Sequence, residues 1–276
     1  TMPANSEKSF SMCAPANVLF SLVQASDTPE LKLKPVDDEK LILVAGGAKS
    51  TLHCLPIEDF PIPPDTKVEM GVIPANVLRA GLKRVLVAAS NDQCRPALCG
   101  VQLAQLQGKV YLAAADGFRL AACRLDNEIK FPSKTSLLIP RGSAVKLAVI
   151  LPESDEPVTI LGSKNNSSLC FAWTGLKFWA QLLDASFPDW QGIIPASFKH
   201  DLYLPAKQTV DAIQRAEVFA REGSHTVSFV PVEGGMSVMG QSDETGKSET
   251  TLEVAMPFRI SFNALFARQG MEASGA

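Results

Sequence analysis

The charged side chains of this sequence recur on segments of helical periodicity. Over residues 75–90 the apolar side chains repeat at helical spacing, and Arg79 and Lys83 fall four residues apart on the opposite face. Arg141 and Lys146 lie at the start of another such segment. A single cation of this kind is equally compatible with a solvated helix surface. Its repetition on successive helices favours the binding of a common polyanion through phosphate contacts.

Metal-binding and nucleophile motifs are not found in the sequence. The six cysteines form no CxxC pair, and the three histidines have no metal-ligand spacing with them. The stretch Val44–Thr51 resembles a phosphate-binding loop, but Ala48 stands where that motif requires a glycine directly before Lys49. No GxSxG nucleophile motif is present either. We therefore predict a non-catalytic binding protein without a metal or a cofactor.

The composition is that of an ordinary globular protein. The chain has 276 residues, 46% of them hydrophobic, and a formal net charge of −3. This charge gives no global basic field, although a basic stripe on one face remains compatible with it. No apolar run approaches the roughly 18 residues that a membrane span needs. The first residues also lack the pattern of a signal peptide, so we expect a cytoplasmic protein without a membrane partner.

A recurring phrase organises the chain: an apolar residue, a proline and then an amphipathic helix. It begins at Ala14-Pro15 and returns at Ile73-Pro74, Ile139-Pro140 and Leu204-Pro205, with a weaker fifth copy at Phe262-Asn263-Ala264-Leu265. Proline suits the start of a helix because its missing N–H would be unpaired there. Successive copies are about 60 to 65 residues apart, which predicts a repeated structural unit.

Short apolar segments that follow each helix predict antiparallel strands. The expected strands are 31–33, 41–45, 50–55, 100–106, 110–115, 120–125, 158–161, 168–173, 177–183, 227–232, 236–240 and 249–254. The pair Asp116-Gly117 joins two of these runs and predicts a tight hairpin in which both turn residues have positive φ. Each unit is therefore expected to hold one helix and three to four antiparallel strands.

A second phrase marks domain boundaries. Phe60-Pro61 and Phe187-Pro188 lie about two units apart, so the units are expected to pair into pseudo-symmetric domains. The predicted organisation is an α+β chain with the second half of one domain at 1–63, a complete domain at 64–195 and the first half of a third at 196–276.

These motifs, in this order, carry a family resemblance. Residues 95–101, the hairpin Ala115–Ala121, Ile139-Pro140-Arg141 and the boundary Phe187-Pro188-Asp189-Trp190 resemble the bacterial sliding clamp, the β subunit of DNA polymerase III. That family commonly has Thr-Asp-Gly-His-Arg-Leu in the hairpin and Phe-Pro-Asp-Tyr at the boundary. The resemblance implies the DNA clamp fold, with three similar domains of two units each. By that measure the chain is expected to be a fragment that lacks the first half of domain 1 and the end of domain 3.

The resemblance also implies a function. Two subunits of such a clamp form a homodimeric ring around double-stranded DNA, and the helices hold the phosphate backbone without reading bases. The protein would then be a processivity factor of DNA polymerase III. Arg141 matches a DNA-facing arginine of the family, whereas Arg79, Lys83 and Lys146 are predicted DNA contacts from their helix faces.

The family's partner pocket takes short linear peptides from DNA polymerase III subunits, the clamp loader and repair polymerases. Carried over by position, its wall would be Leu98, Ala115, Gly117, Phe118, Arg119, Leu120, Pro188 and Ile193. Ala115 replaces the usual Thr, Phe118 the usual His, and Gly192 a position that is often basic, which makes the groove more apolar. Leu98, Leu120 and Ile193 are also compatible with a plain core role. The alternative function is a clamp-like peptide-binding scaffold that cannot close a ring on DNA.

Overall fold

The computed structural model describes residues 10–125, 129, 131–221 and 223–275. The chain divides into two compact units, of which the first ends at Pro64 and the second begins at Asp65. Within the second unit we call residues 65–195 the middle domain and residues 196–275 the third region.

The first unit contains one α-helix and one sheet. Its elements are α1 (Ala16–Gln24), β1 (Leu31–Asp37), β2 (Lys40–Ala45), β3 (Ala48–His53) and the 3-10 turn η1 (Ile57–Asp59). The strands form an antiparallel sheet in the order β1-β2-β3. The buried core of this unit consists of Leu41, Leu43, Leu52 and Cys54, with Leu19 and Leu22 of α1 packed against it.

The middle domain repeats one succession of elements: a strand, a helix and three further strands. The first copy is β4 (Val68–Pro74), α2 (Ala75–Leu86), η2 (Pro96–Leu98), β5 (Gly100–Leu106), β6 (Lys109–Ala115) and β7 (Leu120–Arg124). The second copy is β8 (Ser136–Pro140), α3 (Arg141–Ile150), β9 (Pro157–Gly162), β10 (Ser168–Trp173) and β11 (Leu176–Gln181). A 3-10 turn, η3 (Gln191–Ile193), follows them.

The two copies interlock through the strand that precedes each helix. One sheet has the order β7-β6-β5-β8 and the other has the order β11-β10-β9-β4, so each sheet takes its fourth strand from the other copy. The register pairs Val101 with Ile139 and Ile73 with Val158. The two sheets also meet where the Leu183 amide donates to the Leu138 carbonyl at 2.9 Å. Neither copy is therefore complete without the other.

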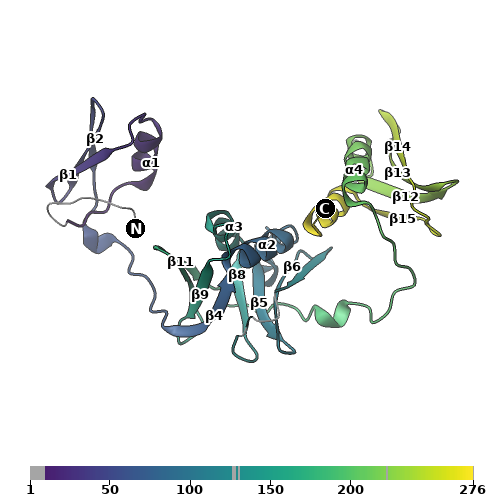
Figure 1. Cartoon of the computed structure of the whole chain (residues 1–276), viewed down its shortest axis with the longest axis horizontal. Coiled ribbons are helices and arrows are strands. Elements are labelled where there is room, and N and C mark those ends of the chain that lie inside the picture. Colours follow the sequence, from purple (N-terminus) through teal and green to yellow (C-terminus); the bar gives the residue numbers. More distant parts are fainter. Residues whose placement is uncertain (1–9, 126–128, 130, 222, 276) are drawn as a thin grey trace. The chain divides into compact units, whose positions relative to one another are not determined.

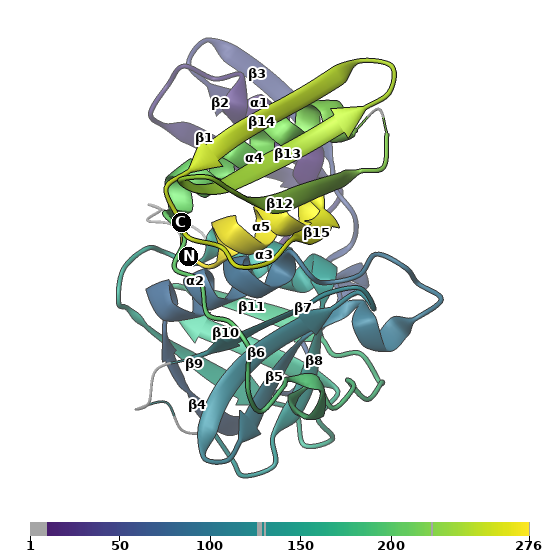
Figure 2. The same cartoon turned by 90° about the vertical axis from the view of Figure 1, so that its right-hand side faces the viewer.

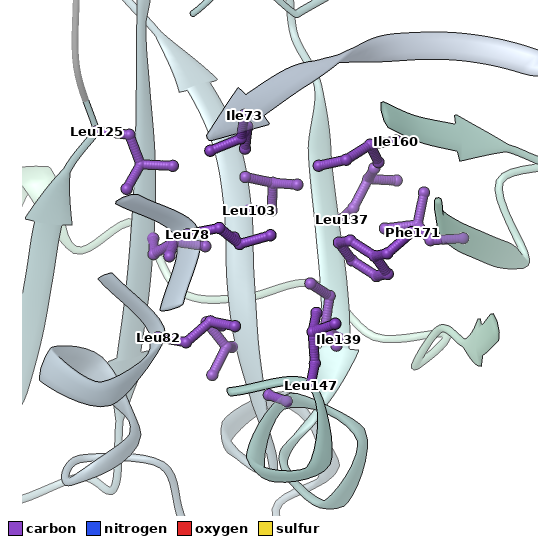
Figure 3. Packing of buried hydrophobic residues seen from close by; sticks show 14 of the residues in the cluster. Ile73, Leu78, Leu82, Leu103, Leu125, Leu137, Ile139, Leu147, Ile160 and Phe171 are labelled. Carbon is purple, nitrogen blue, oxygen red and sulfur yellow. The ribbon is translucent and has the colours of Figure 1, made fainter. Parts of the chain in front are cut away.

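The helices α2 and α3 lie side by side against the same face of both sheets (Figure 1). Their apolar faces and the inner faces of the sheets form one core. In Figure 3, Leu78 and Leu82 of α2 and Leu147 of α3 point toward Leu103, Ile139 and Phe171 of the strands, and the structure buries each of these side chains almost completely. Burial of a leucine side chain stabilises the fold by about 1.5–3 kcal/mol.

The third region holds α4 (Ala206–Ala220), β12 (Thr226–Val232), β13 (Gly235–Ser242), β14 (Gly246–Leu252), β15 (Ile260–Asn263) and α5 (Ala264–Ala273). The strands of its sheet have the order β14-β13-β12-β15, which corresponds to the order β7-β6-β5-β8 in the middle domain. Figure 2 shows α4 lying across β12, β13 and β14 with α5 beside it. Helix α4 lies very close to β13 at Gly240, where a Cβ would lie 2.0 Å from the Ala216 carbonyl oxygen.

The structure confirms the predicted α+β class, the helix after each Pro phrase and the weak fifth copy, which forms β15 and α5. The predicted strands are present with small shifts at their ends. Three strands were missed, namely β4, β8 and β15, each directly before a helix. Each of these strands pairs with the sheet of another copy, an exchange that the sequence did not indicate.

The tight two-residue turn at Asp116-Gly117 was also wrongly predicted. Ala115 pairs with Leu120, so four residues connect β6 to β7, and the Asp116 amide donates to the Arg119 carbonyl at 3.3 Å. Gly117 has a φ of 93°, whereas Asp116 keeps a negative φ. Asp116 instead uses its carboxylate to accept hydrogen bonds within the loop, as short acidic side chains do in turns.

The glycine-rich stretch near Gly46 is a hairpin and not a phosphate loop. Residues Gly46 and Gly47 connect β2 to β3, and Ala45 pairs with Ala48 across the turn. A phosphate loop must lead into a helix, whereas a strand follows here. Among the described residues, no group of His, Cys, Asp or Glu is arranged to hold a metal ion. No described helix is long and apolar enough to cross a membrane.

Candidate nucleic-acid and peptide interfaces

Helix α2 separates its apolar and cationic residues cleanly. Leu78, Leu82 and Val85 recur at helical spacing and are fully buried, whereas Lys83 and Arg84 are exposed. Both cations lie in the last turn, where the carbonyl end of the helix dipole favours positive charge. The helix therefore presents a cationic end to solvent because its other face is fixed in the core.

Arg79 is not free on this surface. Its Nε donates to the Ala148 carbonyl of α3 at 3.2 Å, and its Nη1 pairs with the Glu153 carboxylate. The arginine side chain is only 19% exposed. Arg79 therefore joins α2 to the C-terminal turn of α3, a role that the sequence did not indicate.

The other three predicted DNA contacts differ in how they are held. Lys83 and Lys146 are exposed on α2 and α3. Arg141, the first residue of α3, is partly buried, and its Nε has no hydrogen-bond partner in the described part of the chain. The exposed face of α3 is otherwise apolar, with Val149 72% exposed. The helix pair therefore offers two exposed lysines, one arginine (Arg79) that is paired with α3 and Glu153, and one arginine (Arg141) that is partly buried.

The hairpin loop between β6 and β7 is organised by Asp116. Its carboxylate accepts hydrogen bonds from the amides of Phe118 and Arg119 and from Nε of Arg119, all at 2.9–3.0 Å. Burial raises the pKa of the Asp116 carboxyl, but these hydrogen bonds and the Arg119 charge together outweigh burial and lower that pKa below its ordinary value. The carboxylate is therefore ionised at neutral pH and fixes the Arg119 side chain.

Arg119 also contacts α5 of the third region. Its Nη1 donates to the Gln269 side-chain oxygen at 2.6 Å, and its guanidinium lies 4.2 Å from the centre of the Phe266 ring. An arginine over an aromatic face is a favourable cation–π pair. Arg119, a predicted wall residue of the partner pocket, thus already contacts Asp116, Gln269 and Phe266, and the sequence indicated neither of the last two.

An apolar cavity of about 1220 Å³ adjoins this loop. Phe118, Arg119 and Leu120 line it, and so do Phe229, Met236 and other core residues of the third region. Three arginines (Arg84, Arg119 and Arg124) lie in its wall, and the described wall residues include no carboxylate. The cavity therefore suits apolar anchors accompanied by an acidic group.

The remaining predicted wall residues lie outside this cavity. They are Leu98, Ala115, Gly117, Pro188 and Ile193, of which Ile193 is 70% exposed. Gly117 is covered by Arg95, whose Nη1 lies 2.6 Å from the place of a Cβ at that position. The structure thus brings three of the eight predicted pocket residues together in the wall of this cavity.

Comparison with known proteins supplies a family. The model of the central domain of the DNA polymerase III beta subunit matches residues 72–189, which cover nearly all of the interlocked strands and helices described above. The middle domain is thus similar to the central domain of the DNA polymerase III beta subunit. Its helix pair α2–α3 and its β6–β7 hairpin lie within the matched residues.

Beta sliding clamps are also found among the curated relatives. The chain is 29% identical to that of Bacillus subtilis over 210 residues, which are 75% of this chain and 55% of the relative. It is 26% identical to that of Pseudomonas aeruginosa over 242 residues, which are 87% of this chain and 65% of the relative. The chain thus spans less than two thirds of the length of these two sliding clamps.

Solved structures agree with the clamp fold. The DNA polymerase sliding clamp from Bacillus subtilis matches 97% of this chain and 72% of its own, with a TM-score of 0.86 and 24% identity. The sliding clamp from Pseudomonas aeruginosa matches 95% of this chain and 72% of its own, with a TM-score of 0.83 and 23% identity. The chain therefore has the α+β clamp fold across the middle domain and its flanking regions.

Proposed function

We propose that this chain acts as a sliding clamp, a non-catalytic processivity factor that works as a homodimeric ring around double-stranded DNA in the cytoplasm. The observation that carries the proposal is the helix pair α2–α3 of the middle domain. It lies on one face of both sheets and exposes Lys83 and Lys146. Exposed lysines bind phosphates as point charges without reading bases.

Sliding requires such contacts. A hydrogen bond to a base edge would hold the ring at one sequence, whereas cation–phosphate contacts are equivalent at every step along the duplex. Arg79, Lys83, Arg141 and Lys146 are the proposed DNA contacts. Of these, Lys83 and Lys146 are exposed, Arg79 is paired with Glu153, and Arg141 is partly buried.

A topological experiment tests the ring. The protein is loaded by the clamp loader with ATP onto covalently closed circular DNA and onto the same DNA after linearisation. A ring stays on the circle and slides off the linear ends, so retention on the circle should be much greater. Equal retention on both forms would contradict the ring and favour the clamp-like peptide-binding scaffold.

We also propose that the groove at Phe118 and Leu120 binds short linear peptides of DNA polymerase III subunits, the clamp loader and repair polymerases. Phe118 is 81% exposed, and large exposed aromatic side chains are common anchors at interfaces. Phe118→Ala should weaken the binding of a labelled peptide with aliphatic and aromatic anchors about tenfold or more. Tyr203→Ala is the control, because Tyr203 is 92% exposed and lies outside the cavity wall. Equal weakening by both changes would contradict the groove.

A further inference from the structure

The loop that follows α3 carries a carboxylate toward the cations of α2. Its backbone is fixed, because the Ser154 and Glu156 carbonyls accept hydrogen bonds from the amides of Asn76 and Ala75 at 2.9 and 2.8 Å. These amides belong to the first turn of α2, where helix N–H groups have no partner within the helix. Glu153 is therefore held beside α2 by the main chain of its own loop.

Glu153 neutralises part of the proposed DNA-binding surface. Its carboxylate pairs with Arg79, and its side chain is 82% exposed. The hydrogen bond from Arg79 and the charges of Arg79 and Lys83 lower the pKa of Glu153, so the group is ionised at neutral pH. One exposed carboxylate thus pairs directly with one of the four proposed phosphate contacts.

We infer that Glu153 is a positioning residue that competes with DNA phosphates for Arg79 and so keeps duplex binding weak. The inference rests on the proposed function of the α2–α3 face. A phosphate that approaches this face must displace Glu153 from Arg79 or bind around it. When the ring moves along the duplex, Arg79 can return to Glu153 between one phosphate and the next. The free energy therefore varies less from one position on the DNA to another, which suits a ring that has to slide.

The test measures duplex affinity at several salt concentrations with the full chain. A fluorescent duplex of mixed sequence is titrated with the unchanged protein and with Glu153→Gln, and binding is followed by anisotropy. The variant should bind about threefold more tightly at low salt, and the slope of log affinity against log salt should steepen by up to about one, the effect of roughly one added phosphate contact. Arg79→Ala in the Glu153→Gln background should remove most of the gain.

Two further variants serve as controls. Glu69→Gln makes the same charge change on β4, where Glu69 is exposed and has no ion pair among the described residues, and it should leave affinity unchanged. Glu153→Asp keeps the charge and should retain affinity close to that of the unchanged protein. Loss of an exposed ion pair changes stability little, so the unfolding midpoint of Glu153→Gln should stay the same.

The outcomes separate the inference from the proposed function. If the unchanged protein binds duplex with the expected salt dependence and Glu153→Gln binds equally well, the inference is wrong and the proposed function stands. A gain that Glu69→Gln reproduces would also overturn the inference, since it would reflect net charge alone. If neither the unchanged protein nor Glu153→Gln binds duplex at any salt concentration, both are wrong.

Discussion

The same residues, Pro-Ala-Asn-Val-Leu, begin α1 of the first unit and α2 of the middle domain. In both places the helix starts at the alanine after the proline. Their surroundings differ, because no residue of α1 is buried, whereas Leu78 of α2 is completely buried. An identical local sequence therefore fixes where the helix begins and leaves its burial open.

The difference comes from the second copy of the repeat. In the middle domain α2 packs against α3 and against a four-stranded sheet whose last strand, β8, comes from the other copy. The first unit has three strands and a small core, and Phe20 of α1 is 60% exposed. One helix and three strands thus bury only a small core in the first unit, whereas two interlocked copies share the larger core of the middle domain.

The third region lies between these extremes. It has one four-stranded sheet and two helices, and a partly buried ion pair joins the helices, with Arg268 Nε 2.8 Å from the carboxylate of Glu217. The carboxylate lowers the free energy of the charged guanidinium, so the pKa of Arg268 is raised. In the middle domain the corresponding link is Arg79 on a carbonyl of α3. The two helices of the third region are thus joined by an ion pair between side chains, whereas α2 and α3 are joined by a hydrogen bond from a side chain to the main chain.

The largest effect is expected from the matched leucines of the repeated phrase. Leu78→Ala leaves a cavity in a closed core and should cost about 2–5 kcal/mol of the free energy of unfolding of the middle domain. The chain's three tryptophans (Trp173, Trp179 and Trp190) all lie in that domain, so their fluorescence in urea reports on it. Leu19→Ala in the first unit should leave this transition unmoved. A shift of equal size in both variants would contradict the comparison.

A smaller effect is expected where the helices of the third region meet. Arg268→Ala leaves Glu217 buried with only Arg221, at 3.5 Å, as a cationic partner. Loss of one partner from a buried pair costs about 3–5 kcal/mol when no other cation is near, so we expect about 2 kcal/mol here. Amide hydrogen exchange should become faster in α4 and α5 of the variant and should stay unchanged in α2 and α3. That result would support the predicted loss of stability in the third region. Arg215→Ala, an exposed change on α4, is the control.

The two boundary phrases should also respond differently. Trp190 is buried, and its Nε1 donates to Gln102 at 3.0 Å, whereas Phe60 of the first phrase is 55% exposed. Gln102→Ala leaves the indole N–H buried without its partner and should cost about 1–3 kcal/mol in urea unfolding. Phe60→Ala should cost less than about 0.5 kcal/mol. If Gln102→Ala leaves the stability unchanged, another group must accept the hydrogen bond of the Trp190 indole N–H.

The smallest effect concerns the acid sensitivity of the β6–β7 loop. The lowered pKa of Asp116 means that its contribution to stability is full above the ordinary carboxyl value of 3.8 and is lost as pH falls below that value through the folded-state pKa. Asp116→Asn should therefore reduce stability at neutral pH by about 1 kcal/mol and have little effect at the acid end. Urea unfolding at several pH values measures both. An equal loss at every pH would show that the charge of Asp116 is not the cause.

The sequence predicted the elements better than their pairing. The prolines of the repeated phrase mark the starts of α1 to α4, and apolar alternation marks most strands, because both signals are local. The strands β4, β8 and β15 were missed since each stands directly before a helix and pairs with a strand outside its own copy. For β4 that partner is β9, beyond two helices and four other strands.

The candidate sites followed the same division. Exposure of Lys83 and Lys146 agrees with the helix periodicity, and the hairpin of Phe118 and Leu120 does line a cavity. The sequence did not indicate that Arg79 pairs with Glu153 or that Arg119 contacts Phe266 and Gln269. These partners are 74, 147 and 150 residues away along the chain, so no local pattern connects them.

By itself, the sequence determined where helices and strands begin and which faces are apolar, because backbone preferences and side-chain periodicity act over a few residues. The tertiary structure decided which copy supplies each sheet's fourth strand, which helices are buried and which cations stay free. Those outcomes depend on packing and charge pairing between segments that are distant in sequence. Identical residues are therefore exposed or half-buried in α1, whereas Ala75 and Leu78 among them are buried in α2.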